Sequence, residues 1–456
     1  MSEDEIDDEF AEAGDAVYSR LLERLGEANP QPRLWPTRRA LELLGDPQRS
    51  YPIIHITGTN GKTSTSRIAE SILRAYGLRT GLFTSPHLER FNERIVIDGV
   101  SITNEALARN WNDIEPYLEI VDAECIERNE PRLTFFEAMT VLAYACFADA
   151  PVDVAVIEVG MGGEWDSTNV GDGQVEVITP ISLDHMNRLG STVTEIAKTK
   201  SGIIKPATAV VSASQVPEAL VELQHAAELT ESTLAVQGTD FDVASVAVAV
   251  GGQLITVKGL AGTYSELFLP LYGDHQAQNA AVAIASVESF LGGGMQPLQQ
   301  SLVEEGLASA TSPGRLQLIG VDPTILVDAA HNPSGAETLA AAIRSYFDFS
   351  GVAVVLGILA DKDAVGIIRA LSPIASVFLV TQSTSERAIP AGQLAALVAA
   401  TTGRTDVEIY EEPIDAFESA RAWAAEADGR AVLATGSITL VGEAITIADD
   451  RAWKEK

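Results

Sequence analysis

The chain has 456 residues, which is more than one hydrophobic core supports comfortably and predicts two or three domains. Its composition, 46% hydrophobic and 21% charged, is typical of a globular protein, and no stretch has the length and freedom from charge needed to span a bilayer. A net charge of −33 opposes binding to nucleic acid or to an anionic membrane, because the long-range field repels both.

The first predicted element is an acidic extension that continues into a helix, over residues 1–35. The opening residues, MSEDEIDDEF, are acidic where a signal peptide is basic, and we therefore expect a cytoplasmic protein. Pro30, Pro32 and Pro36 break the helical pattern before the first strand.

Residues 53–66 read IIHITGTNGKTSTS and predict a strand, a tight turn and a helix. In this context the backbone N–H groups of the turn and the positive end of the helix dipole point at one spot. Lys62 adds a full charge there, and Thr63 offers a hydroxyl to Mg²⁺. The pattern therefore favours a nucleotide phosphate site over an ordinary glycine turn. The common motif has a glycine where this chain has Ile56, so the loop is a variant.

Strand-like runs then alternate with helix-length segments, at residues 79–84, 152–159, 175–181 and 207–211. Such alternation predicts a mostly parallel sheet covered by helices on both faces. Residues 241–272 change to short alternating runs with glycines, which predicts a small antiparallel sheet, and a helix follows at about 276–290. We therefore expect an α/β fold in which residues 36–311 form a P-loop-type domain carrying both sheets.

A second strand and helix series begins after residue 311, and it predicts a smaller, Rossmann-like α/β domain over residues 312–456. Its predicted strands lie at 325–328, 352–359, 377–380, 407–410 and 431–435. No GxGxxG motif follows the first of them, so we expect no dinucleotide site within this domain. The two cysteines, Cys125 and Cys146, have the spacing of neither a disulfide framework nor a zinc site and are expected to be reduced thiols.

Polar residues close several of the predicted strands, where ligands collect in an open parallel sheet. Glu158 ends an unbroken apolar run and suits a Mg²⁺ ligand beside the phosphates better than a surface acid. His185 ends the next strand, which favours a second metal role over a structural one. The cluster of Lys198, Lys200 and Lys205 fits either a solvated helix end or a lysine near the γ-phosphate.

In the second predicted domain, Asp328 and His331 also close a strand. A helix cap with a surface histidine and a role in the site are equally compatible with that position. Arg315 follows the interdomain Pro-Gly and is either solvated or within reach of a nucleotide phosphate across the domain gap. The residues alone thus predict a two-domain α/β enzyme that uses ATP or GTP.

Nine segments carry a resemblance to a known family. They are GTNGKTS at 58–64, FTSPHLERFNERI at 83–95, FFEAMT at 135–140, VIEVGMGGEWDSTN at 156–169, ITPISLDH at 178–185, KSGIIKP at 200–206, DHQAQNA at 274–280, SPGRLQ at 312–317 and DAAHNP at 328–333. Together they resemble folylpolyglutamate synthase/dihydrofolate synthase, the folate branch of the Mur ligase family, over about residues 35–440. GTNGKT marks the wider family, whereas SPHLxRFNERI and GMGGxxDxTN point to the folate branch.

The resemblance implies an ATP-dependent amide ligase that adds L-glutamate to dihydropteroate, to tetrahydrofolate (poly)glutamates, or to both. ATP would phosphorylate a carboxylate of the pterin substrate, and the amine of glutamate would attack the acyl phosphate. The charge on the transferred phosphoryl group calls for clamping by metal and cations, and two Mg²⁺ ions are implied. We expect a monomer that binds neither nucleic acid nor membrane.

The resemblance also implies roles for individual residues. The nucleotide contacts it implies are Gly58, Thr59, Asn60, Gly61, Lys62, Thr63, Asn279, Arg315, Asp328 and His331. The metal ligands are Ser85, Glu158 and His185, and the catalytic residues are Lys62, Glu158, His185 and Lys200, the last as a carbamylated lysine. The pterin contacts are Thr134, Phe135, Phe136, Glu137, Trp165, Asp166 and Ser167.

The chain departs from the family pattern at Lys200, because Thr199-Lys200-Ser201-Gly202 stands where Glu-Lys-Ala-Gly is common. Two other classes share part of the signal. A cell-wall Mur ligase has a further domain ahead of the phosphate loop, and only about fifty residues precede Gly58 here. A nucleotide-binding regulatory protein would not need Glu158, His185 and Lys200 as a second metal site.

Overall fold

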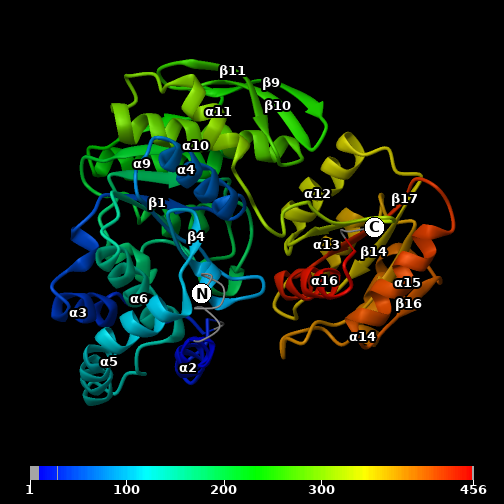
Figure 1. The fold of residues 1–456 in the computed structure, drawn as a ribbon, viewed down its shortest axis with the longest axis horizontal. Coiled ribbons are helices and arrows are strands. Elements are labelled where there is room, and N and C mark those ends of the chain that lie inside the picture. Colours follow the sequence, from blue (N-terminus) through cyan, green and yellow to red (C-terminus); the bar gives the residue numbers. More distant parts are fainter. Residues whose placement is uncertain (1–9, 28, 454–456) are drawn as a thin grey trace.

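The computed structural model describes residues 10–27 and 29–453 and shows two α/β bodies side by side (Figure 1). The body coloured blue to green carries an eight-stranded and a three-stranded sheet, and the body coloured yellow to red carries a six-stranded sheet. The predicted fold class is confirmed. The acidic start of the predicted extension, residues 1–9, lies outside the described residues. The domain boundary at 311 and 312 stays a prediction, and it falls between a helix of the first body and a strand of the second.

The largest sheet has the strand order β4-β3-β2-β5-β1-β6-β7-β8, and only the pairs β2-β3 and β3-β4 are antiparallel among the described strands. Its strands are β1 (Ile53–Thr57), β2 (Thr80–Phe83), β3 (Ile95–Ile97), β4 (Val100–Ser101), β5 (Val154–Glu158), β6 (Val175–Ile178), β7 (Ala209–Ser212) and β8 (Thr233–Val236). The sequence did not predict β3, β4 and β8. Strands β4 and β8 are edge strands that are exposed or partly exposed, and β3, which lies between β4 and β2, has only three residues. None of them has the long apolar run of a buried parallel strand.

Helices cover both faces of this sheet, and successive residues of β1 point to opposite faces. Ile54 and Ile56 pack into a core with helices α4, α10 and α11, whereas Ile53 packs into a core with α2, α3, α5 and α6. The helices of this body are α2 (Ala11–Leu22), α3 (Trp35–Leu43), α4 (Lys62–Ala75), α5 (Asn104–Glu127), α6 (Phe135–Asp149), α7 (Met186–Leu189), α8 (Val193–Ser201), α9 (Pro217–Leu229), α10 (Asp274–Gly292) and α11 (Gln300–Ala308), with short 3₁₀ turns η1 (Pro47–Arg49), η2 (Phe91–Arg94) and η3 (Ser167–Val170).

The predicted antiparallel sheet is present as β9 (Asp242–Ala249), β10 (Gly252–Lys258) and β11 (Thr263–Leu269), with β10 in the centre. It packs on α10 and α11 at the top of the first body (Figure 1). Buried Glu288 of α10 fixes the β10–β11 turn, because its carboxylate accepts hydrogen bonds from the backbone N–H groups of Leu260 and Gly262. This sheet lies away from the polar strand ends considered below.

The second body has the strand order β12-β13-β17-β14-β15-β16, parallel except at β12. Its strands are β12 (Gln317–Val321), β13 (Thr324–Asp328), β14 (Gly351–Leu356), β15 (Val377–Val380), β16 (Val407–Ile409) and β17 (Arg430–Thr435). Its helices are α12 (Pro333–Tyr346), α13 (Ala364–Leu371), α14 (Ala391–Thr402), α15 (Pro413–Ala425) and α16 (Ile438–Asp450). All five predicted strands appear, and β12 is an additional half-exposed edge strand.

Candidate active site

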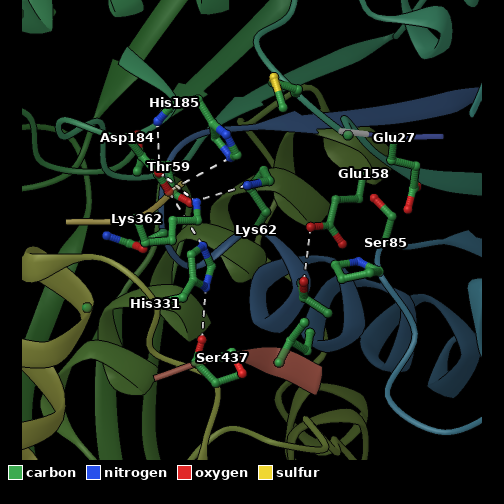
Figure 2. Close-up of a pocket in the computed structure, with 18 of the residues that line it drawn as sticks. Glu27, Thr59, Lys62, Ser85, Glu158, Asp184, His185, His331, Lys362 and Ser437 are labelled. Atoms are coloured by element: carbon green, nitrogen blue, oxygen red, sulfur yellow. Dashed lines mark hydrogen bonds and ion pairs between the residues drawn. The ribbon is translucent and has the colours of Figure 1, made fainter. Parts of the chain in front are cut away.

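A cavity of about 1340 Å³ lies where the two bodies meet, and residues of both line it (Figure 2). The carboxyl ends of β1, β5 and β6 supply its walls from the first body, and the end of β13 supplies one from the second. Ligands bind at such strand ends in open α/β sheets. The cavity is therefore the candidate active site.

The phosphate loop lies on one wall of this cavity. Gly58 and Gly61 have φ of 149° and 87°, in the region that favours glycine, and helix α4 begins at Lys62 directly after them. A Cβ at Gly61 would lie 2.5 Å from Asn279 Oδ1, so the predicted contact residue Asn279 sits directly over the turn. Lys62 Nζ donates hydrogen bonds to the carbonyls of Gly58 (3.1 Å) and Thr59 (3.2 Å). The loop is thus held in a tight, backbone-exposing turn.

Glu158 ends β5 beside this loop. Thr63 Oγ1 donates a 3.0 Å hydrogen bond to Glu158 Oε1, while Oε2 has no hydrogen-bond partner within the described part of the chain. Burial raises the pKa of Glu158, and the charge of Lys62 opposes that shift. A buried, half-satisfied carboxylate beside a phosphate loop is suited to a cation that arrives with the phosphates.

Lys200 lies in the last turn of α8 and is 4% exposed. Its Nζ donates a 2.7 Å hydrogen bond to the carbonyl of Gly58, so the lysine points at the loop and not at solvent. Burial, and then the charge of Lys62, lower the pKa of Lys200 to about 7. The sequence left two interpretations of the lysine cluster, a solvated helix end or a lysine near the γ-phosphate. Lys200 lines the cavity beside the phosphate loop, which fits the second.

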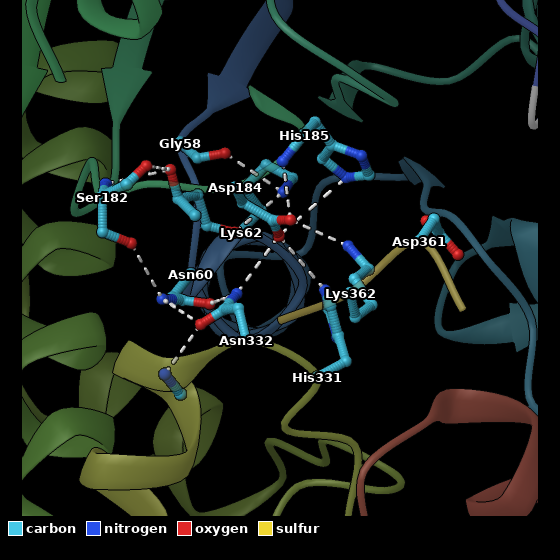
Figure 3. A network of polar contacts seen from close by, with 12 residues as sticks. Gly58, Asn60, Lys62, Ser182, Asp184, His185, His331, Asn332, Asp361 and Lys362 are labelled. Carbon is cyan, nitrogen blue, oxygen red and sulfur yellow. Dashed lines mark hydrogen bonds and ion pairs between the residues drawn. The ribbon is translucent and has the colours of Figure 1, made fainter. Parts of the chain in front are cut away.

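His185 follows Asp184, which is the centre of a polar network between the bodies (Figure 3). Asp184 accepts hydrogen bonds from Lys362 Nζ (2.8 Å) and Asn332 Nδ2 (3.2 Å), and it lies 3.5 Å from His331 Nε2. Burial opposes ionisation, but His331, His185 and Lys362 hold the pKa of Asp184 well below its usual range. Burial lowers the pKa of His185 to about 4.

The same network includes the phosphate loop. Asn332 Nδ2 donates to Asn60 Oδ1 (3.0 Å), and Asn60 Nδ2 donates back to Asn332 Oδ1 (3.4 Å). The predicted site residues did not include Asp184, Asn332 or Lys362. Lys362 follows the end of β14, as Asn332 follows the end of β13, so the rule that ligands collect at strand ends could have found both.

Arg315 and Asp328 line the cavity from the second body. Asp328 accepts hydrogen bonds from the backbone N–H groups of Leu316 (2.8 Å) and Ala330 (2.9 Å), and it thereby ties the Arg315 segment to the end of β13. Burial raises the pKa of Asp328, and the charge of Arg315 opposes that shift. His331 Nδ1 is 2.9 Å from the carbonyl of Ala329, which directs Nε2 toward Asp184.

The predicted pterin contacts fall into two groups. Thr134 caps α6, accepting from Glu137 N (3.2 Å), while the Glu137 carboxylate accepts from Thr134 N (2.7 Å). Arg33 pairs with both oxygens of Glu137 at 2.9 and 3.0 Å. Phe136 lines the cavity, but Phe135 lies in the core with its ring 5.3 Å from the guanidinium carbon of Arg94.

The second group comprises Trp165, Asp166 and Ser167, which line the cavity after β5. Asp166 Oδ2 accepts from Met161 N (2.9 Å), and Oδ1 accepts from the backbone and the hydroxyl of Thr168. Burial raises the pKa of Asp166, and these hydrogen bonds oppose that shift.

Arg94 is a cavity residue that the sequence analysis did not single out. Its guanidinium pairs with Glu27 at 2.7 Å, and its Nε donates to His87 Nδ1 at 2.8 Å. Ser85 lines the cavity from the same segment. Within the described residues, no group of three or more His, Cys, Asp or Glu side chains is arranged to hold a metal ion by itself.

Comparisons with known proteins identify the family. The model of the Mur ligase middle domain matches residues 56–287, and that of the Mur ligase glutamate ligase domain matches residues 314–438. The dihydrofolate synthase/folylpolyglutamate synthase of Mycobacterium tuberculosis is 41% identical over 94% of this chain and 93% of its own length. The chain belongs to the folylpolyglutamate synthase/dihydrofolate synthase family of Mur ligases. It is an ATP-dependent glutamate ligase, as the resemblance implied.

Solved structures of this family have the same fold. The Mycobacterium tuberculosis folylpolyglutamate synthase complexed with ADP matches with a TM-score of 0.92 and 40% identity, over 96% of this chain and 99% of the other. Escherichia coli FolC in complex with DHPP and ADP matches with a TM-score of 0.83 and 28% identity, over 96% and 98% of the two chains. No helix within residues 10–27 and 29–453 is long and apolar enough to cross a membrane.

Proposed function

We propose that the cavity binds ATP on the Gly58–Thr63 loop with a pterin carboxylate beside it, and that it joins L-glutamate to that carboxylate through an acyl phosphate. The observation that carries the proposal is that one cavity holds the phosphate loop, the buried Lys200, and the cations Lys362 and Arg315 of the second body. The relatives provide further support, because FolC is described in complex with DHPP and ADP.

The reaction needs activation because a carboxylate at neutral pH is a poor electrophile. The γ-phosphoryl group of ATP moves to a carboxylate oxygen, and ADP leaves. The amine nitrogen of glutamate then attacks the carbonyl carbon, loses a proton, and expels phosphate as the amide forms. Lys62 and Arg315 are placed to stabilise the charge on the transferred group, since cations in a buried cavity act more strongly than in water.

The residues fit a magnesium ion that is bound together with the nucleotide. Mg²⁺ takes one or two protein oxygens and completes its shell with phosphate oxygens and water, so a ready-made cluster of acids is not required. Glu158 Oε2, which has no hydrogen-bond partner among the residues that the structure describes, and the hydroxyls of Thr63 and Ser85 are oxygen donors in one cavity. When bound, the ion would neutralise charge on the phosphates.

Lys200 is suited to carbamylation, which would supply oxygen ligands for a second ion together with His185. An amine must be uncharged to add to CO₂, and a lysine with a pKa lowered to about 7 is largely uncharged at mildly alkaline pH. Starting from the neutral amine, the addition forms the N–C bond and releases one proton. Together with the proton that the ammonium group loses first, a cation thus becomes a carbamate anion, which offers oxygen ligands. The unusual neighbours Thr199 and Ser201 do not prevent the side chain from reaching the loop.

The pterin end of the cavity is formed by Asp166, Phe136, Trp165 and the capped start of α6. A pterin ring presents adjacent N–H donors and two apolar faces. A carboxylate complements the donors, and the aromatic side chains complement the faces. Glutamate would be received at the opposite end, where His331 and Lys362 now share the carboxylate of Asp184.

The proposal is tested by measuring ADP release with Mg²⁺ and glutamate in the presence of dihydropteroate, of a reduced folate, or of no acceptor. We expect release above the acceptor-free rate with at least one pterin and its loss when EDTA is added. Glu158→Gln should lose most of the activity, and Glu164→Gln, which changes a neighbouring exposed acid outside the cavity, should not. If both pterins give only the acceptor-free rate, the proposal is wrong.

A further inference from the structure

Four buried polar side chains run from the centre of the first sheet to the cavity wall. His55 of β1 and Glu176 of β6 are direct partners in the parallel register, and both are at most 1% exposed. His55 Nε2 lies 2.9 Å from Thr168 Oγ1, which donates a 2.6 Å hydrogen bond to Asp166 Oδ1. Asp166 lines the cavity, and the other three lie behind it.

In this series of hydrogen-bonded side chains, the direction of the bond nearest the cavity, between Thr168 and Asp166, is fixed. A hydroxyl has one hydrogen, and Thr168 gives it to the Asp166 carboxylate. Thr168 Oγ1 must then accept from His55, so Nε2 of the imidazole carries a hydrogen. Asp166 keeps its orientation through this bond and through the backbone N–H groups of Thr168 and Met161.

At the other end of this series, His55 and Glu176 have polar atoms without hydrogen-bond partners among the described residues. His55 Nδ1 is 3.5 Å from Glu176 Oε2, and within the described residues neither Nδ1 nor either oxygen of Glu176 has a hydrogen-bond partner. One proton shared between Nδ1 and Oε2 serves both groups and leaves the pair without net charge, whereas losing it would leave a buried negative charge. Burial raises the pKa of Glu176, which is consistent with a retained proton.

Lys205 and Asp172 are charged groups near Glu176: the charge of Lys205 lowers the pKa of Glu176, and that of Asp172 raises it. Lys205 is already bound, because its Nζ donates to the side chain and the carbonyl of Asn169 at 2.7 and 3.0 Å. The Glu176 carboxylate packs closely against Gly173, where a Cβ would lie only 2.5 Å from Oε1. His55 and Glu176 thus form a buried, closely packed pair that takes no part in the proposed phosphate or metal binding.

We propose that His55 and Glu176 are positioning residues for pterin binding: their shared proton keeps the Nε2 hydrogen of His55 on Thr168, and Thr168 in turn holds the Asp166 carboxylate toward the substrate. The proposal rests on the proposed contact between Asp166 and the pterin. Without a proton donor at Nδ1, the imidazole can carry its hydrogen there instead. Nε2 then becomes an acceptor, the Thr168 hydroxyl turns to His55, and Asp166 loses its shortest hydrogen bond.

Three substitutions separate this role from a merely structural one. Thr168→Val removes the hydroxyl, and Glu176→Met removes the proton donor at similar volume. We expect each to raise KM for dihydropteroate about ten-fold, the range for losing a hydrogen bond to a charged group, with kcat and KM for ATP within about two-fold of wild type. Glu176→Gln keeps an N–H donor for Nδ1 and should restore a near-wild-type KM.

Tyr144→Phe is the matched control. Tyr144 is 1% exposed and donates a 2.7 Å hydrogen bond to the backbone carbonyl of Thr168, so its loss removes a buried bond at the same residue and leaves the hydroxyl chain intact. KM for dihydropteroate should not change in this variant. Ring ¹⁵N spectra of His55 should show the Nε2 hydrogen in wild type and a mixture of tautomers in Glu176→Met.

Asp166→Asn distinguishes failure of this inference from failure of the proposed function. An unchanged KM for dihydropteroate in Asp166→Asn would show that Asp166 does not contact the pterin, and the proposed contact itself would be wrong. A raised KM there, with unchanged values in Thr168→Val and Glu176→Met, would overturn the positioning role alone. An equal rise in Tyr144→Phe, or a rise in Glu176→Gln as large as in Glu176→Met, would overturn it as well.

Discussion

Lys200 is a lysine buried beside the positive charge of Lys62, and this placement makes folding depend on pH. Its pKa is lowered to about 7 in the folded chain, whereas a lysine in the unfolded chain titrates near 10.4. Between these values the unfolded chain binds one more proton, so raising the pH stabilises the folded chain. In CO₂-free, metal-free buffer, the free energy of unfolding should rise from pH 7 to 10 by on the order of 4 kcal/mol more than in Lys200→Met.

Urea titrations at several pH values measure this difference. Lys258→Met, which removes an exposed lysine, should follow the pH dependence of the wild type. Parallel curves for wild type and Lys200→Met would show that Lys200 stays charged in the fold, and the argument for carbamylation would lose its physical basis.

At the same scale, the sequence predicts where a side chain lies when a local motif fixes its position. Lys62 and Thr63 follow a glycine turn, and Glu158 ends an apolar run, so each position follows from a few neighbours. Asp184 and Arg94 acquire their partners only by folding, because Lys362 and Glu27 are distant in sequence. Phe135 lies in the core and not along the cavity for a geometric reason: consecutive helical residues point about 100° apart, so Phe136 faces the cavity and Phe135 faces the core.

Among the elements, α6 combines a helix cap with a wall of the cavity. Thr134 accepts from the N–H of Glu137, and Thr103 caps α5 in the same way by accepting from Ala106 N at 3.2 Å. Losing such a cap costs about 1 kcal/mol. Thr134→Ala and Thr103→Ala should therefore lower the free energy of unfolding by similar amounts, measured by urea denaturation, while only Thr134→Ala raises KM for dihydropteroate. An unchanged KM in Thr134→Ala would place the pterin elsewhere in the cavity.

The elements that the sequence predicted are those with a strong periodic signal. Strands β5 and β14 are almost wholly apolar runs buried on both faces, and β1 is apolar except at His55 and Thr57, so the pattern alone located them. Strands β4 and β12 lie at sheet edges and are wholly or partly exposed, so their pairing depends on neighbours that the local sequence does not reveal.

For the whole molecule, the decisive contact is the one that joins the two bodies across the cavity. The phosphate loop meets α12 through Asn60 and Asn332, and Ser64 of α4 is 2.9 Å from Ser312. The carboxylate of Asp184 lies close to Lys362 and His331 of the second body and to His185 of the first. A bound phosphate would bring negative charge to the same cations. In the free chain, the Asp184 carboxylate therefore takes the place of that charge and holds the two bodies together.

Removing this carboxylate should loosen the two bodies. In Asp184→Ala, Lys362 and Lys62 would face each other without the anion that now separates their charges, and like charges in a partly buried cavity repel. We expect a larger radius of gyration by small-angle scattering than in wild type at low salt, a smaller difference at high salt, and recompaction when ATP and Mg²⁺ are added. Asp361→Ala, which removes a more exposed partner of Arg387 within the second body, is the control and should scatter like wild type. Identical scattering from Asp184→Ala and wild type would mean that packing, such as that of Leu88 against Gly442, holds the bodies together without the carboxylate.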